Sequence, residues 1–406
     1  MSARIAAALL AGTFLTAAGQ ATVLAWLAWH GPLVTRADLM HRLRAVPEDA
    51  STQRLLARVE ERAGRFERAR ARLAAALRRS PLAADLWLER AEAALHAGRI
   101  DEALRAAERA CTLAPVDADL NYRAALVLLQ AGDAAAAAPR LRSVLDNAPD
   151  LAAQVVDLAH GVYRDDALVL RRIVPPEAES IRRFLAWAYD RHLTAAASAG
   201  WDALLGRGAA LADRLQHVSF LIEQGEIETA ASLWVAAYGP WGGGRVFEGG
   251  FERDPVNAGF GWVFHRFEGV RVRVAGGAAA AEGTRGLVIE FSGGNPEFAH
   301  VTQIVPVTGG RRYRLSALMR ADGLTSLSGP RLEVQAHVAC PGMVTEEGPE
   351  LRGTRGWRPV SIEFATPPGC RAVRVLVHRV RTDRFDRDVR GRLYLDDVRL
   401  LEVGEA

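Results

Sequence analysis

The stretch "AGRIDEALRAAERACTLAP" at residues 97–115 has one copy before it and one after it. The earlier copy is "AGRFERARARLAAALRRSP" at 63–81, and the later one is "AGDAAAAAPRLRSVLDNAP" at 131–149. In every copy an alanine follows the glycine by five residues and a proline closes the stretch. The copies are 34 residues apart, and a fixed period of this length indicates a solenoid of paired helices.

Each recurring residue has a physical role in such a pair. The glycine ends the first helix in a left-handed backbone conformation. The alanine lets the two helices cross closely, and the proline stops the second helix. Pro139 falls inside the second helix of the third unit, so we expect that helix to be bent or short.

These positions resemble the tetratricopeptide repeat, with three clear units over residues 50–151. Degenerate helical units follow at 152–240, so the helical domain is predicted to span 45–240. The resemblance implies that segments of protein partners bind along a concave groove. Arg54, Arg58 and Arg62 form one stripe on the first helix, which is either a site for an acidic segment or a solvated face neutralised in part by Glu60 and Glu61.

Residues 1–35 contain a run of 25 residues without charge, Ile5 to Trp29. About 20 apolar residues span a bilayer as a helix, and Trp26 and Trp29 suit the membrane interface. The run predicts an uncleaved transmembrane anchor, with a cleaved signal peptide as the alternative. Arginines after the run favour a cytoplasmic location for the rest of the chain, whereas the C-terminal domain favours an exported one.

The segment "GPWGGGRVFEGG" at 239–250 predicts a domain boundary, because glycine and proline interrupt helices. Beyond it, apolar and polar residues alternate in eight short runs, which predict strands at 270–276, 286–293, 300–307, 312–321, 332–340, 358–367, 371–380 and 392–403. We therefore expect a jelly-roll β-sandwich over 245–404.

The order of five landmarks makes 246–402 similar to carbohydrate-binding modules of the kind attached to xylanases and cellulases. The landmarks are "GGFE…GW", "GTRGLVIEF", "TQIVPVTGGRRYRLSALMRA", "GWRPVSIEFATPPG" and "GRLYLDDVRL". Related modules hold a structural calcium ion, so the resemblance implies Glu252, Asp396 and Asp254 as ligands. Strand alternation places Asp396 on the inward face with Val398 and Leu400. The alternative is that Glu252 pairs with an arginine such as Arg253 or Arg271 and that Asp396 caps a turn.

Four polar residues are candidates for binding sugar on the sandwich. Gln335 and His337 share one face of a predicted strand, and Arg374 and His378 share one face of another. If the two strands are neighbours, the four side chains form one patch. Trp262 is the nearest aromatic platform, and the alternative is that its ring lies in the core.

Cys340 ends one of these predicted strands and Cys370 precedes the other. If the strands are antiparallel neighbours, the two sulfur atoms meet at one end of the sheet. A disulfide there would require an oxidising compartment.

Several function classes have no support in the sequence. The net charge of +3 is too small to indicate nucleic-acid binding. We find no nucleophile elbow, phosphate-binding loop or HExxH motif, so a non-enzyme is expected.

The sequence thus predicts a multidomain protein with an N-terminal transmembrane helix, an α-helical solenoid and an all-β sandwich. The first hypothesis is a bacterial inner-membrane scaffold with its soluble part in the periplasm. It would bind protein segments on the repeats and a polysaccharide on the sandwich, in exopolysaccharide or surface-glycan assembly. The alternatives are a purely protein–protein assembly factor with a structural sandwich and a cytoplasm-facing adaptor.

Overall fold

The computed structural model describes residues 36–45, 49–240 and 245–404. The chain divides into two compact units, one ending at Phe184 and the other beginning at Leu185. The predicted membrane anchor at 1–35 lies outside the described residues. Among the described residues, no helix combines the length and the apolar character needed to cross a membrane.

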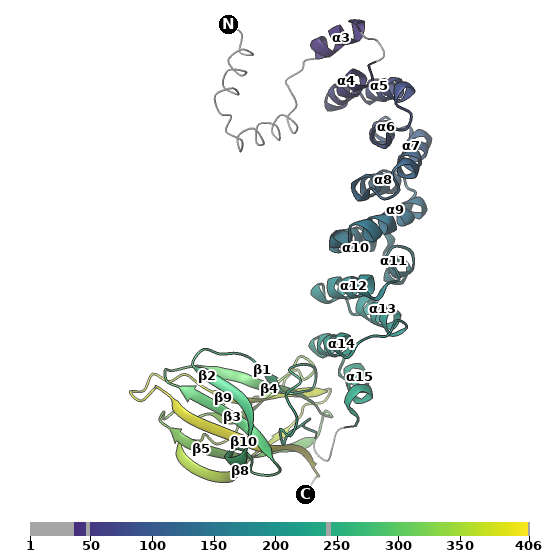
Figure 1. Ribbon diagram of the computed structural model, residues 1–406. Coiled ribbons are helices and arrows are strands. Elements are labelled where there is room, and N and C mark those ends of the chain that lie inside the picture. Colours follow the sequence, from purple (N-terminus) through teal and green to yellow (C-terminus); the bar gives the residue numbers. More distant parts are fainter. Residues whose placement is uncertain (1–35, 46–48, 241–244, 405–406) are drawn as a thin grey trace, which may run out of the picture. The chain divides into compact units, whose positions relative to one another are not determined.

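The first unit consists of helices that follow one another in short pairs. Figure 1 shows α4, α6 and α8 stacked along one side and α5, α7 and α9 along the other. The helices are α3 (Arg36–Ala45), α4 (Ala50–Arg62), α5 (Phe66–Arg79), α6 (Ala84–His96), α7 (Ile100–Leu113), α8 (Ala118–Gln130), α9 (Ala134–Asn147), α10 (Ala152–Tyr163), α11 (Asp166–Arg172) and the start of α12 (Ala178–Asp190), with a short 3-10 helix at Pro149–Leu151.

The recurring residues occupy the predicted places. Gly64, Gly98 and Gly132 follow α4, α6 and α8 with φ values of +68°, +73° and +86°, which only glycine adopts without strain. The repeat alanines are fully buried where the helices meet, at Ala57, Ala69, Ala91, Ala103, Ala125 and Ala137. Pro139 does not shorten α9, because the helix continues through this residue and spans 14 residues.

The second unit begins with helices and continues into the sandwich. Its helices are the end of α12, then α13 (Thr194–Leu205), α14 (Leu211–Glu223) and α15 (Ile227–Tyr238). Gly225, between α14 and α15, has φ +79°, as in the clear repeats. This agrees with the interpretation of the segment as a degenerate helical pair.

Two antiparallel five-stranded sheets form the sandwich, in the orders β1-β4-β9-β6-β7 and β2-β3-β10-β5-β8. All eight predicted strands are present. The two additional strands, β1 and β7, have only two residues each. The strands are β1 (Val263–Phe264), β2 (Val270–Gly276), β3 (Arg285–Ser292), β4 (Phe298–Pro306), β5 (Arg312–Leu324), β6 (Arg331–Ala336), β7 (Glu346–Glu347), β8 (Gly353–Ala365), β9 (Ala372–Arg379) and β10 (Arg390–Val403).

Strand β10 contains a β-bulge, which strict alternation of side chains along the strand does not predict. The register shifts between Asp396 and Arg399, and Asp397 has φ +49°. A bulge adds one residue to a strand and so reverses which face the following side chains occupy. Tyr394 accordingly packs in a small cluster outside the main core, whereas Val398 and Leu400 lie in the core. The expectation that Asp396 shares a face with Val398 and Leu400 is therefore wrong.

Helices α14 and α15 pack directly on the sandwich within the second unit. The indole of Trp234 is 1 % exposed and makes edge contacts with Phe247 and Phe260, at ring-centroid distances of 5.0 Å and 6.0 Å. The Oγ of Ser219 accepts a hydrogen bond of 3.0 Å from the backbone N–H of Gly259. The last helical pair is thus attached to the sandwich by side-chain packing as well as through the glycine-rich segment.

Candidate functional site

The surface formed by α4, α6 and α8, which we call the first-helix face, carries a ladder of ion pairs between successive repeats. The guanidinium groups of Arg54 and Arg58 donate to Glu89 at 2.8 Å and 2.7 Å. One repeat further, Arg123 donates to both carboxylate oxygens of Glu92, at 2.8 Å and 2.9 Å. Each pair joins neighbouring repeats, so the ladder runs along the solenoid.

The predicted arginine stripe is therefore largely neutralised, although not by the glutamates expected. Arg54 and Arg58 pair with Glu89 of the following repeat, and Arg62 is exposed at the end of α4. Glu60 instead pairs with Arg36 and Arg65. Arg58 and Glu89 are 31 residues apart, and so are Glu92 and Arg123, so a search for opposite charges at this spacing could have identified these partners.

At the carboxyl ends of α4, α6 and α8 lies a cavity of about 270 Å³, which we call the groove pocket. It is lined by Glu61, Phe66, Glu92, Leu95, His96, Arg123, Leu126, Val127 and Gln130. The rings of Phe66 and His96 stack with centroids 4.9 Å apart. Burial, and next the carboxylates of Glu89 and Glu92, raise the pKa of Glu61 to about 7. The pocket therefore combines apolar walls with one acidic group whose ionised form is disfavoured.

On the sandwich, the structure brings together three of the four predicted sugar-binding residues. Gln335 on β6 lies directly opposite Arg374 on β9, and His378 follows Arg374 on the same face. The Nδ1 of His378 lies 2.5 Å from Glu333, whose carboxylate also accepts a bond of 2.6 Å from Gln335. Glu333 was not predicted, although strand alternation placed it on this face.

His337 and Trp262 do not join this patch. Strand β6 ends at Ala336, so His337 lies in the following loop and is 8 % exposed. Burial, with a smaller effect of Arg374, lowers the pKa of His337 to about 4. Trp262 is 2 % exposed and packs against Phe251 in the main core, with ring centroids 5.3 Å apart. The interpretation of Trp262 as a sugar platform is wrong, because a buried ring presents no face to a ligand.

The three predicted calcium ligands contact one loop, residues 281–285. Glu252 accepts hydrogen bonds from the backbone N–H groups of Thr284 and Arg285, at 2.8 Å and 3.1 Å. Asp396 is fully buried and accepts from Ala281 and Glu282, at 2.7 Å and 3.0 Å. Asp254 pairs with Arg285. Two carboxylates distant in sequence thus accept hydrogen bonds from one loop.

The bonds received by these carboxylates come from N–H and O–H donors, three on Glu252 and three on Asp396, whereas Asp254 receives one from Arg285. Within the described ranges, no group of three acidic, histidine or cysteine side chains is placed to hold a metal ion. In this arrangement Glu252 and Asp396 act as hydrogen-bond acceptors, and the turn-capping alternative describes Asp396. Calcium binding itself stays a prediction.

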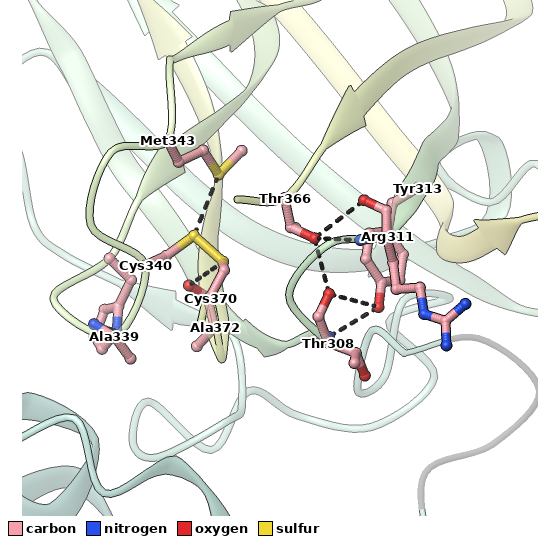
Figure 2. Close-up of a disulfide and its surroundings, with 10 residues drawn as sticks. Thr308, Arg311, Tyr313, Ala339, Cys340, Met343, Thr366, Cys370 and Ala372 are labelled. Carbon is pink, nitrogen blue, oxygen red and sulfur yellow. Dashed lines mark hydrogen bonds between the residues drawn. A yellow bond between two sulfur atoms is a disulfide. The ribbon is translucent and has the colours of Figure 1, made fainter. Parts of the chain in front are cut away.

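Cys340 and Cys370 form a disulfide at one end of the β6–β9 pair, which are antiparallel neighbours. Figure 2 shows the bridge with the sulfur of Met343 beside Cys340, 3.8 Å away. Both cysteines are buried. The neighbouring residues Ala339 and Arg371 lie beside Gly225, in the turn before α15. Arg371 also pairs with Glu228 on α15. The disulfide therefore holds two loops that also contact the last helical pair.

Residues 54–118 match the family model of the tetratricopeptide repeat, so the first unit contains repeats of this kind. No curated protein matches the chain. Among solved structures, the crystal structure of MamA is similar at 16 % identity, covering 42 % of this chain and 85 % of that one, with a TM-score of 0.28.

Two further solved structures are similar. YrrB, described as a TPR protein with an unusual peptide-binding site, has 16 % identity over 49 % of this chain and 90 % of that one, with a TM-score of 0.27. TmCBM61 in complex with β-1,4-galactotriose has 16 % identity over 39 % of this chain and 99 % of that one, with a TM-score of 0.26. TM-scores this low do not transfer a ligand from these proteins to this chain.

Proposed function

We propose that the chain is a non-enzymatic scaffold whose first-helix face binds an extended segment of a protein partner. The observation that carries this proposal is the groove pocket, set among repeats that match the tetratricopeptide family. Repeat solenoids present extended surfaces built from equivalent residues of successive units, which suits a linear partner. The ion-pair ladder supports a segment that carries charges as well as apolar side chains.

The sandwich is proposed to bind a polysaccharide through the patch of Gln335, Arg374 and His378. The support is the cross-strand placement of these polar side chains on one sheet face. Their hydrogen bonds to Glu333 hold two of them in fixed orientations, which lowers the entropic cost of binding hydroxyl groups. An alternative function is a protein–protein assembly factor in which the sandwich is structural.

An extracytoplasmic location is part of the proposal. The disulfide between Cys340 and Cys370 supports an oxidising compartment such as the periplasm, and residues 5–29 would supply the inner-membrane anchor. Exopolysaccharide or surface-glycan assembly would suit both binding activities. A cytoplasm-facing adaptor is the alternative, and a C-terminal reporter active only in the cytoplasm would favour it.

Selection of random 16-residue peptides on the full chain, followed by calorimetry, tests the first-helix face. We expect the enriched peptides to compete with one another and to lose binding in Leu126→Glu, which changes a wall of the groove pocket. The control is Val116→Glu, in a loop where the side chain is 71 % exposed, and it should bind like the parent chain. Equal binding by both variants would contradict the proposal.

The sugar proposal has a separate test. We expect the full chain to bind at least one polysaccharide on an array and the double variant Gln335→Ala, Arg374→Ala to lose that binding. Arg358→Ala, an exposed arginine on β8 of the other sheet, is the matched control. Absence of binding to every polysaccharide would favour the purely structural sandwich.

A further inference from the structure

Glu61 is the one acidic side chain lining the groove pocket that forms no ion pair with a described residue, because the nearby Arg58 and Arg123 pair with other glutamates. The other lining carboxylate, Glu92, is held by Arg123 through both oxygens. The nearby Glu89 is held by Arg54 and Arg58. Glu61 accepts no side-chain hydrogen bond from a described residue, although it is partly buried. The ladder of pairs thus lacks a cation at this position.

The walls of the pocket suit the rest of a cationic side chain. Phe66 and His96 form a stacked aromatic wall, and Leu126 and Val127 form an aliphatic one. A planar guanidinium stacks on aromatic faces and pairs with a carboxylate through two N–H groups, which an ammonium does not do. The carboxyl ends of three helices also converge here, and helix carboxyl ends favour positive charge.

We propose that the groove pocket binds an arginine side chain of the partner segment, with its guanidinium paired to Glu61 and its stem against Leu126. This inference rests on the proposed function and specifies the partner chemistry: a segment with an arginine that reaches the ends of α4, α6 and α8. The bound guanidinium completes the ladder by supplying the missing cation.

Binding should depend on pH in a defined direction. The groups that face Glu61 are Arg58 on its own helix, Glu89, Glu92 and His96 on α6, and Arg123 on α8. With the pKa of Glu61 raised to about 7, the carboxyl is mostly neutral at pH 6 and mostly ionised at pH 8. Because the guanidinium pairs with the ionised form, binding should be about tenfold tighter at pH 8 than at pH 6.

The test uses two small probes, N-acetyl-arginine amide and its neutral isostere N-acetyl-citrulline amide. Each is titrated into the full chain while the methyl resonances of Leu126 and Val127 are followed by NMR. We expect saturable shifts with the arginine probe only, tighter at pH 8, and lost in Glu61→Gln. Glu67→Gln is the control, because Glu67 pairs with Arg70 and Arg99 and does not line the pocket.

The variant His96→Gln removes the histidine of the pocket, and it should keep the pH dependence. Equal shifts with both probes, or none with either, would overturn the inference, as would unchanged binding in Glu61→Gln. The outcome is distinguishable from failure of the proposed function. If selected peptides need Leu126 but carry no arginine and ignore Glu61→Gln, only the inference fails. If arginine binds but no peptide does, only the proposed function fails.

Discussion

At the scale of single residues, two glycines leave the space that a large neighbouring side chain occupies. Gly259 has φ +58°, and a Cβ added there would lie 2.5 Å from Trp234. Gly283 has φ +63°, and a Cβ there would lie 2.2 Å from the carboxylate of Glu252. The first glycine lets α15 pack on the sandwich, and the second lets the 281–285 loop donate to Glu252. Neither dependence is visible without the fold, because each joins residues that are distant in sequence.

Gly259→Ala is expected to destabilise the second unit by about 2–4 kcal/mol, the sum of left-handed backbone strain and overpacking against Trp234. Gly294→Ala is the matched control, since it has φ +82° but no atom within 4 Å of the added Cβ. It should lose only about 1 kcal/mol. Urea unfolding of both variants measures the difference, and equal losses would show that Trp234 does not pack as described.

If the carboxylates of Glu252 and Asp396 keep the N–H donors that they have here, calcium should have no effect on stability. The melting temperature of the full chain should be the same in calcium and in chelator. A rise with calcium that disappears in Asp396→Asn would restore the calcium site implied by the family resemblance. Such a site would require Glu252 and Asp396 to give up hydrogen bonds from the 281–285 loop.

At the scale of elements, the periodic patterns in the sequence predicted most helices and strands. Local irregularities, which have no period, are the reason that parts of the candidate site were predicted wrongly. The 34-residue period predicted α4–α9, and alternation predicted eight strands. Strands β1 and β7 were missed because two residues cannot show alternation. The predicted face of Asp396 was wrong because no glycine or proline in the sequence indicates the bulge at Asp397. Glu333 was missed, although its alternation with Gln335 on β6 places both on one face.

Removal of the disulfide is expected to weaken the second unit. For the 30-residue separation of Cys340 and Cys370, loss of the cross-link should cost about 3–4 kcal/mol. We expect Cys340→Ser, Cys370→Ser to show this loss and to be insensitive to dithiothreitol, which should weaken the parent chain to a similar degree. If the parent chain and the double variant unfold at the same urea concentration, the disulfide does not stabilise this unit.

Acid should destabilise the second unit through two buried histidines. Burial lowers the pKa of His217 to about 4, and burial lowers that of His337 to about 4 as well. In the unfolded chain both titrate near about 6.5. Their contribution to stability is therefore complete above pH 6.5 and is lost as pH falls toward 4. Unfolding between pH 7 and pH 4 should show this slope, and His217→Phe should reduce it.

At the scale of the whole molecule, the compact units divide within α12 and not at the glycine-rich segment. The segment at 239–250 does mark the change from helix to strand. However, α14 and α15 pack on the sandwich through Trp234 and Arg371, and a composition shift cannot reveal such packing. The repeats with the groove pocket belong to the first unit, and the patch of Gln335, Arg374 and His378 belongs to the second. A scaffold with two separate binding surfaces is consistent with this division.

Amide hydrogen exchange of the full chain, with and without a saturating selected peptide, tests the central claim most directly. We expect slower exchange in α4, α6 and α8, concentrated at their carboxyl ends around Glu61, His96 and Leu126. Strands β6 and β9 should exchange as in the free protein. Slower exchange confined to α5, α7 and α9, or to the sandwich, would contradict the assignment of partner binding to the first-helix face.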